Sequence, residues 1–99
     1  MTIEIVQTEI FRYWLAQLSD RIARNRILAR LERAANGNLG DWKSIGGGAA
    51  EMRIDHGPGY RVYFTRQGDR LIIILAGGTK KTQAKDIARA IEIAEQLKE

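Results

Sequence analysis

The feature that most constrains the fold is an unbroken apolar run at residues 71–76, Leu-Ile-Ile-Ile-Leu-Ala, which leads directly into Gly-Gly-Thr-Lys-Lys at residues 77–81. A short aliphatic run bounded by glycine predicts a strand that is buried on both faces and is therefore central in a sheet. The residues after it predict a turn into a helix, with Thr82 as the helix cap. Positive charge thus stands at the end of a central strand, where it is placed to hold phosphate.

A second strand carries the same kind of charge. Residues 57–64 are Gly-Pro-Gly-Tyr-Arg-Val-Tyr-Phe, so a turn is followed by a strand expected over residues 60–67. Side chains of a strand alternate between its two faces. The faces of this strand are Tyr60, Val62 and Phe64 on one side and Arg61, Tyr63 and Thr65 on the other. If the helices cover the first face, Arg61 faces an open groove.

Capping and turn residues divide the rest of the chain into short elements. The expected order is βααβββα, with a strand at 2–7, helices at 8–18 and 20–36, strands at 50–55, 60–67 and 70–76, and a last helix from residue 82. Five glycines in residues 37–48 predict a long mobile loop between the helices and the later strands. The fold class is therefore α+β, an antiparallel sheet packed against an N-terminal helical hairpin and followed by a C-terminal helix.

Composition narrows the class of protein. A chain of 99 residues is expected to form a single domain, residues 1–99, with one hydrophobic core. It has no cysteine and one histidine, which argues against a disulfide framework and a zinc centre, and no metal or other cofactor is expected. Neither a signal peptide nor an apolar run of roughly 20 residues is visible, so we expect a cytoplasmic protein without membrane contact. The net charge of +4 favours an acidic partner such as nucleic acid.

Five motifs follow one another along the chain. They are Thr8-Glu9-x-Phe11-x-x-Trp14-Leu15, Gly37-Asn38-x-Gly40-Asp41, Glu51-Met52-Arg53-Ile54, Gly57-Pro58-Gly59-Tyr60-Arg61-Val62-Tyr63-Phe64 and Gly77-Gly78-Thr79-Lys80-Lys81-Thr82-Gln83-x-x-Asp86-Ile87. In this order and spacing the chain resembles the RelE/ParE toxin superfamily over essentially its whole length. The closer match is to the HigB-like "addiction module killer protein" branch.

The resemblance implies a RelE-like fold and the role of toxin in a type II toxin–antitoxin module. The implied activity is metal-independent endoribonuclease cleavage of mRNA, commonly in the ribosomal A site. The implied partners are mRNA, the ribosome and a cognate antitoxin, which in this branch is typically a small helix-turn-helix DNA-binding protein that neutralises the toxin.

Arginine suits the chemistry of such a cleavage. The ribose 2′-hydroxyl attacks the adjacent phosphorus, and the protein must stabilise the extra charge on the phosphorane. A guanidinium stays protonated and offers a planar fork to two phosphate oxygens. Arg61 is the first candidate for this catalytic role, and Arg53, on a neighbouring strand, is a candidate RNA-binding residue. The structural alternative is a cross-strand ion pair of either arginine with Glu51.

Two further groups are catalytic candidates. Lys80 and Lys81 stand where a helix should begin, and exposed amides together with an ammonium group form an anion site there. In related toxins this turn supplies basic catalytic residues, although the sequence leaves open which lysine points inward and whether the turn is merely solvated. His56 has an ordinary pKa near neutrality and lies in the turn between the arginine-bearing strands. It is either a proton carrier or an exposed turn residue.

Further RNA contacts are expected from two pairs of residues. Tyr60 and Tyr63 are candidates for base stacking, although Tyr60 has the parity of a core residue. Arg26 and Arg30 belong to a basic run on the second helix that could attach to ribosomal RNA, and the same run is what a solvated helix face shows. Trp14 lies on the apolar stripe of the first helix and is expected in the core.

Two other functions are compatible with the sequence. A toxin of the ParE branch inhibits DNA gyrase without cutting RNA, and the shared fold does not separate it from a nuclease. A catalytically weak relative that only binds RNA or antitoxin is the other alternative, because no paired carboxylates or second histidine are evident. Positive groups gathered near one end of the sheet favour phosphate chemistry over gyrase inhibition.

Overall fold

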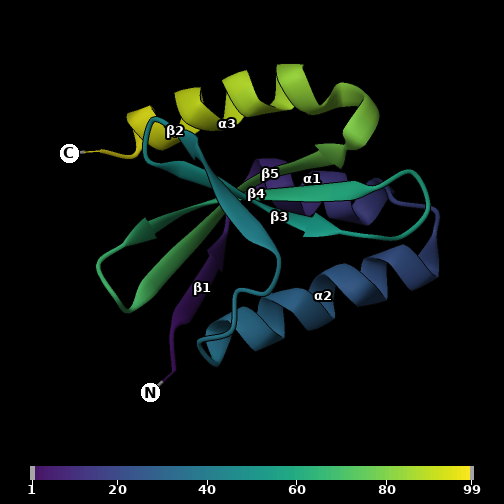
Figure 1. Ribbon diagram of the computed structural model, residues 1–99, viewed down its shortest axis with the longest axis horizontal. Helices are drawn as coiled ribbons and strands as arrows, with labels where there is room; N and C mark the ends of the chain where they lie inside the picture. The colour runs from purple at the N-terminus through teal and green to yellow at the C-terminus, as the bar shows by residue number, and fades with distance from the viewer. Residues whose placement is uncertain (1, 99) are drawn as a thin grey trace.

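A computed structural model of the chain describes residues 2–98 and shows a five-stranded sheet with helices on both faces (Figure 1). The elements are β1 (Glu4–Gln7), α1 (Glu9–Gln17), α2 (Arg21–Ala35), β2 (Trp42–Gly46), β3 (Ala49–Ile54), β4 (Tyr60–Gln67), β5 (Leu71–Thr79), a 3-10 turn (Lys80–Thr82) and α3 (Gln83–Gln96). The strand order is β1-β5-β4-β3-β2, so the apolar run in β5 lies inside the sheet as expected. The α+β class is confirmed.

Two details of the sheet differ from the expectation. Residues 42–46 are not part of a mobile loop but form β2, which pairs antiparallel with β3. This strand is short and largely exposed, and a register shift between Ser44 and Gly46 interrupts it. It therefore lacks the alternation of apolar and polar residues by which a strand is recognised in a sequence. In addition β1 runs parallel to β5, which makes the sheet mixed rather than antiparallel. Both features depend on pairing between distant segments.

Local capping explains why the first two helices begin where they do. The side chain of Thr8 accepts a hydrogen bond from the amide of Phe11, and that of Asp20 accepts one from the amide of Ala23, at 3.1 Å in each case. These contacts satisfy amides that have no partner in the first turn of a helix. Within residues 2–98, no helix combines the length and hydropathy that a bilayer crossing requires.

The two faces of the sheet bury different clusters. The α1–α2 hairpin packs on the face that carries Val62 and Ile72, whereas α3 packs on the face that carries Tyr63 and Leu75. The second face was expected to be open. α3 covers the part of this face that carries Tyr63 and Leu75, and Arg61 lies on the same face beyond it.

Arg30 connects the helical hairpin to the sheet. Its side chain is 9% exposed, and its guanidinium donates to the carbonyl oxygens of Arg53, Leu39 and Asp41. Burial, followed by the charge of Arg33, lowers the pKa of Arg30. The expectation that Arg30 contacts RNA is therefore corrected, because its donors are engaged by the backbone. Arg26, by contrast, is exposed on α2.

We expect Arg30→Ala to lower the free energy of unfolding by about 2–4 kcal/mol, because three carbonyl groups lose a charged donor and a cavity opens. Arg26→Ala on the same helix is the matched control and should change stability by no more than about 0.5 kcal/mol. Urea unfolding followed by circular dichroism measures both. Equal effects of the two substitutions would contradict a structural role for Arg30.

Candidate functional site

The register of the sheet brings the strand arginines together. Arg53 on β3 is paired with Arg61 on β4, and Arg61 is paired with Gly78 on β5. Directly opposed residues project from the same face of a sheet. Two guanidinium groups therefore stand side by side, next to Gly78 of β5, which has no side chain to cover them.

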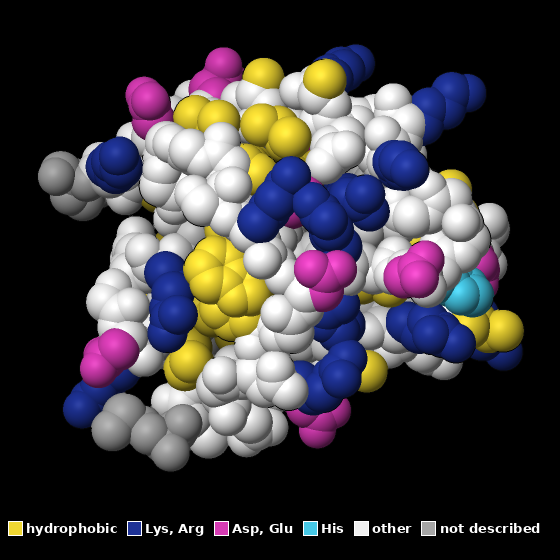
Figure 2. Space-filling view, in the orientation of Figure 1, with side chains coloured by type: hydrophobic (Ala, Val, Ile, Leu, Met, Phe, Trp, Pro, Cys, Tyr) yellow, Lys and Arg dark blue, Asp and Glu magenta, His cyan; other side chains and the backbone are white. Residues whose placement is uncertain are grey.

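A cavity of about 240 Å³ lies at this end of the sheet. Its lining residues are Asp41, Arg53, Asp55, Gly59, Arg61 and Lys80. The turn holds Lys80 in place, because its amide donates to the carbonyl oxygen of Gly59 at 2.7 Å. Of the two lysines, Lys80 lines this cavity, whereas Lys81 is exposed and does not. Figure 2 shows Lys and Arg side chains gathered on this face with carboxylates among them.

A buried carboxylate underlies the arginines. Glu51 is 0% exposed, and it accepts a hydrogen bond from Arg53 Nε at 3.2 Å. Gln83, the first residue of α3, donates to both carboxylate oxygens at 2.9 and 3.2 Å. Arg61 Nε lies 3.9 Å and Lys43 Nζ 4.0 Å from the same carboxylate. The cross-strand ion pair considered from the sequence is thus present, and Arg61 lines the cavity as well.

Charge in and under the cavity is nearly balanced. Three cations, on Arg53, Arg61 and Lys80, are accompanied by the carboxylates of Asp41, Asp55 and Glu51. What this site can offer a phosphate is therefore the directed donors of its guanidinium groups rather than an excess of positive charge. The side chain of Arg61 is only 11% exposed, so little water competes for those donors.

The two carboxylates that line the cavity, Asp41 and Asp55, were not among the site residues predicted from the sequence. Asp55 has the strand parity of Arg53, which was a usable signal. Asp41 lay in the segment interpreted as a mobile loop, so its position could not be inferred. The structure holds it beside β3, where its carbonyl oxygen accepts from the amide of Arg53 at 2.9 Å and from Arg30 at 3.1 Å. The cavity therefore contains groups that can exchange protons.

His56 is not placed with Arg61 and Lys80. Its Nε2 atom lies 3.2 Å from Oδ2 of Asp20, the residue that caps α2, and it does not line the cavity. The amide of Ala23, followed by His56, holds the pKa of Asp20 below its ordinary value. His56 thus ties the β3–β4 turn to the helical hairpin, and we do not assign it a part in proton transfer.

The two tyrosines expected to stack on RNA are buried. Tyr60 is 6% exposed and contacts the edge of the Trp14 ring, with the ring centroids 6.3 Å apart. Tyr63 is 0% exposed, and burial, followed by the charges of Asp86 and Glu51, raises the pKa of its hydroxyl. Neither ring presents a face to a nucleotide, which corrects that expectation.

Known proteins resemble this chain in sequence and in fold. Residues 13–99 match the family described as "Phage derived protein Gp49-like (DUF891)". A protein of Haemophilus influenzae (strain ATCC 51907 / DSM 11121 / KW20 / Rd), described as uncharacterized, is 47% identical over 97 residues, which cover 98% of each chain. A mutant of the Escherichia coli toxin RelE in the free state has a similar structure, with a TM-score of 0.71, 14% identity, and coverage of 93% of this chain and 97% of that one. The resemblance stated from the sequence is confirmed, and at this identity the solved structure establishes the fold.

We expect Glu51→Gln to lower the free energy of unfolding by about 1–3 kcal/mol, because the charge-assisted bonds from Arg53 and Gln83 lose their ionised acceptor. Glu51→Ala should cost about 3–5 kcal/mol, since it leaves guanidinium groups unpaired. Urea unfolding measures both, with Glu92→Gln on the exposed side of α3 as the control. A stability of Glu51→Ala equal to that of the control would contradict the role of Glu51 as the fixed point of the cavity.

Proposed function

The chain belongs to the family of phage-derived, Gp49-like proteins, and from this premise we propose that it is the toxin of a type II toxin–antitoxin module. Its activity is metal-independent cleavage of mRNA on the ribosome, and a cognate antitoxin neutralises it. The observation that carries the proposal is the convergence of Arg61 and Lys80 on one cavity at the open end of the sheet.

In the proposed reaction these two cations contact the scissile phosphate. The 2′-oxygen attacks the phosphorus, the bond from phosphorus to the 5′-oxygen breaks, and the products are a 2′,3′-cyclic phosphate and a 5′-hydroxyl. Arg61 stabilises the charge that develops on the non-bridging oxygens, because its planar donors lie in a largely buried site where such bonds are strong. Lys80, more exposed, attracts the phosphate and neutralises it.

Asp41 and Asp55 supply the proton transfers. One carboxylate takes the proton of the attacking 2′-hydroxyl, and the carboxyl group formed in this way, or water, gives a proton to the 5′-oxygen as it leaves. Both residues line the cavity that holds Arg61, whereas His56 faces Asp20. The chemistry is therefore assigned to carboxylates in place of imidazole.

Attachment to the ribosome uses sequence-independent charge. Arg26 is exposed on α2, within a helix that carries further arginines, and the whole chain has a net charge of +4. Contacts of this kind release counterions and weaken as salt increases. The antitoxin, which in this branch is typically a helix-turn-helix protein, binds the toxin in the cytoplasm and neutralises it.

The proposal is tested by expressing the protein in a bacterium and mapping mRNA 5′-ends at A-site codons. We expect codon-phased cuts that fall by about 10²–10³ in Arg61→Ala, because one preorganised donor to the transition state is lost. In Lys80→Ala the cuts should fall by at least about tenfold. Lys81→Ala is the matched control in the same turn and should retain activity, as should His56→Gln.

Supercoiling of a reporter plasmid is measured in the same cells. Loss of supercoiling with intact mRNA would support the alternative of a ParE-like gyrase inhibitor and contradict the nuclease. Cuts that persist unchanged in Arg61→Ala would also remove the proposed site. Growth arrest with neither effect would indicate a relative that only binds RNA or antitoxin.

We expect Asp41→Asn and Asp55→Asn to separate the two proton-transfer roles. Each carboxamide keeps the shape of the side chain but cannot take up a proton, so the carboxylate that acts as base should lose about 10²–10⁴ in cleavage rate. Single-turnover cleavage on purified ribosomes programmed with mRNA gives the rate, and sedimentation with ribosomes gives binding. Full activity of both variants would exclude carboxylates as the base.

A further inference from the structure

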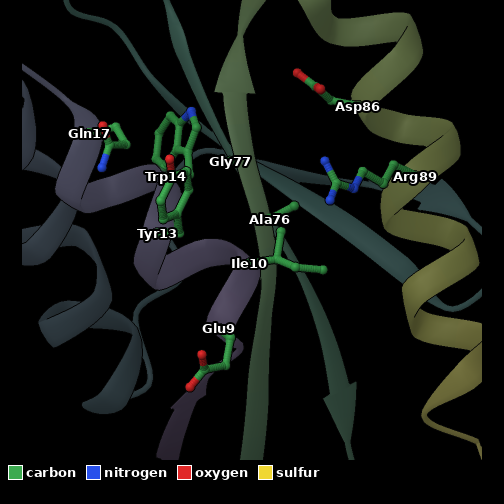
Figure 3. A pocket seen from close by; sticks show the side chains of 9 residues that line it. All are labelled: Glu9, Ile10, Tyr13, Trp14, Gln17, Ala76, Gly77, Asp86 and Arg89. Carbon is green, nitrogen blue, oxygen red and sulfur yellow. The ribbon is translucent and has the colours of Figure 1, made fainter.

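A second hollow, a groove of about 590 Å³, opens along the free edge of β5 (Figure 3). Its floor is the backbone of β5 at Ala76 and Gly77, and one wall is formed by Ile10, Tyr13 and Trp14 of α1. Tyr13 is 69% exposed and Ile10 is 37% exposed, so both present apolar surface to the groove. This wall has apolar surface without a covering partner in the described chain.

The opposite wall of the groove is charged. Asp86 and Arg89 of α3 stand across β5 from the aromatic residues of α1, and the guanidinium of Arg89 extends toward Ala76 (Figure 3). Asp86 already accepts a hydrogen bond from the hydroxyl of Thr82. Among residues 2–98, no ion pair engages Arg89, which is exposed.

The floor of the groove is an interrupted sheet edge. β1 pairs with β5 only as far as Gln7 opposite Ile74. Thr8 then closes the ladder, because its amide donates to the Ile74 carbonyl at 3.0 Å and its hydroxyl to the Leu75 carbonyl at 2.8 Å. Beyond this point the chain turns into α1, and within the described residues no strand pairs with 76–79 on this side of β5.

Gly77 presents its backbone to the groove. Antiparallel neighbours alternate between residues that exchange hydrogen bonds and residues that do not. The bond from the Lys80 amide to the Gly59 carbonyl sets the phase, so Gly77, opposite Val62, directs its amide and carbonyl away from β4. The corresponding groups of Thr79 are covered by the hydroxyl of Thr82. A β-carbon at Gly77 would overlap the Trp14 ring, so the bare backbone is required at this position.

We infer that the groove binds an extended peptide segment of a partner protein, which continues the line of β1 and pairs with β5 at Gly77. Side chains of a strand alternate, so one residue of the segment packs on Tyr13 and Ile10 while the next reaches Arg89. The segment therefore alternates apolar and acidic residues. Glu9 lies at the β1 end of the groove (Figure 3). Because its carboxylate repels another anion, we expect the acidic residue of the segment opposite Arg89 and not at the β1 end.

The other edge of the sheet does not offer an equivalent site. β2 is exposed, carries Lys43, and is interrupted by a register shift between Ser44 and Gly46. Charge and irregularity of this kind oppose pairing with another strand. The β5 edge, by contrast, is walled by a helix on each face of the sheet, so an incoming strand gains side-chain contacts as well as backbone hydrogen bonds.

A synthetic peptide tests the inference directly. The probe is acetyl-Ser-Leu-Glu-Val-Glu-Leu-Ser-amide, titrated into the full ¹⁵N-labelled chain and followed by amide chemical shifts. We expect the Gly77 amide proton to move downfield and to exchange more slowly, with further shifts confined to α1 and to the start of α3. The same peptide methylated at the central valine amide and a variant with lysine for glutamate are controls, and both should bind at least about tenfold more weakly, which corresponds to about 1.4 kcal/mol.

Two exposed side chains supply matched variants. Arg89→Glu should weaken binding of the acidic peptide about tenfold or more and strengthen binding of the lysine peptide, because an anion replaces the cation of the α3 wall. Tyr13→Ala should weaken the binding of both peptides. Arg12→Ala, on the same helix but absent from the groove lining, should leave both affinities unchanged.

Several outcomes would overturn the inference. Shifts that avoid Gly77, or equal binding of the N-methylated peptide, would exclude pairing with β5. Shifts in the groove that depend on protein concentration without peptide, together with dimer formation in sedimentation, would identify a second copy as the occupant. The inference does not rest on the nuclease proposal, since Tyr13→Ala and Arg89→Glu are expected to leave mRNA cleavage unchanged.

Discussion

The carboxylate of Glu51 is the contact on which the proposed site depends. A carboxylate without solvent is stable only when it is paired and hydrogen-bonded, and here its hydrogen bonds come from Arg53 on its own strand and from Gln83 on α3, with Arg61 of β4 close by. The guanidinium groups are therefore held before any phosphate arrives. The same carboxylate offsets their charge, so the site favours fixed geometry over a strong positive potential.

The length of β5 relative to β1 produces the second site. β5 extends past the last residue of β1, and two glycines at that point let structure approach closely from both faces of the sheet. Gly77 accommodates the Trp14 ring on the hairpin face, and Gly78 accommodates Asp86 on the face of α3. The Gly-Gly pair, which the sequence linked only to a turn, is therefore a packing requirement for α1 and α3.

Features that depend on residues close together in the sequence were predicted correctly. The apolar run of β5, the caps of the first two helices and the shared face of Arg53 and Arg61 follow from periodicity and side-chain chemistry. The burial of Arg30 was also accessible, because it lies three residues after Ile27 and four before Ala34, which are both on the core stripe. An arginine in that stripe must find buried acceptors. Arg30 was instead grouped with the neighbouring exposed arginines of the same helix, and was therefore predicted to be exposed.

The remaining features required contacts between distant segments. β2 is defined by pairing with β3, and the burial of Tyr63 by α3, which joins the sheet from the end of the chain. His56 sits in a turn, where no periodicity fixes the direction of a side chain, and its orientation is set by Asp20. The placement of Arg53 and Arg61 was easier to infer than that of His56, because the pleat alone assigns a face to each strand residue.

The cavity and the groove share α3 but not the same residues. Gln83 begins the helix and bonds to Glu51, while Asp86 and Arg89 face the groove about one and two turns later. Asp86 also accepts from Thr82 in the turn that carries Lys80, and it packs against Gly78 beside Arg61. A substitution at Asp86 would thus disturb both sites, and its effects could not be attributed to either. Tyr13 and Arg89 do not line the cavity, so they are the positions at which the proposed peptide binding and the proposed RNA cleavage can be separated.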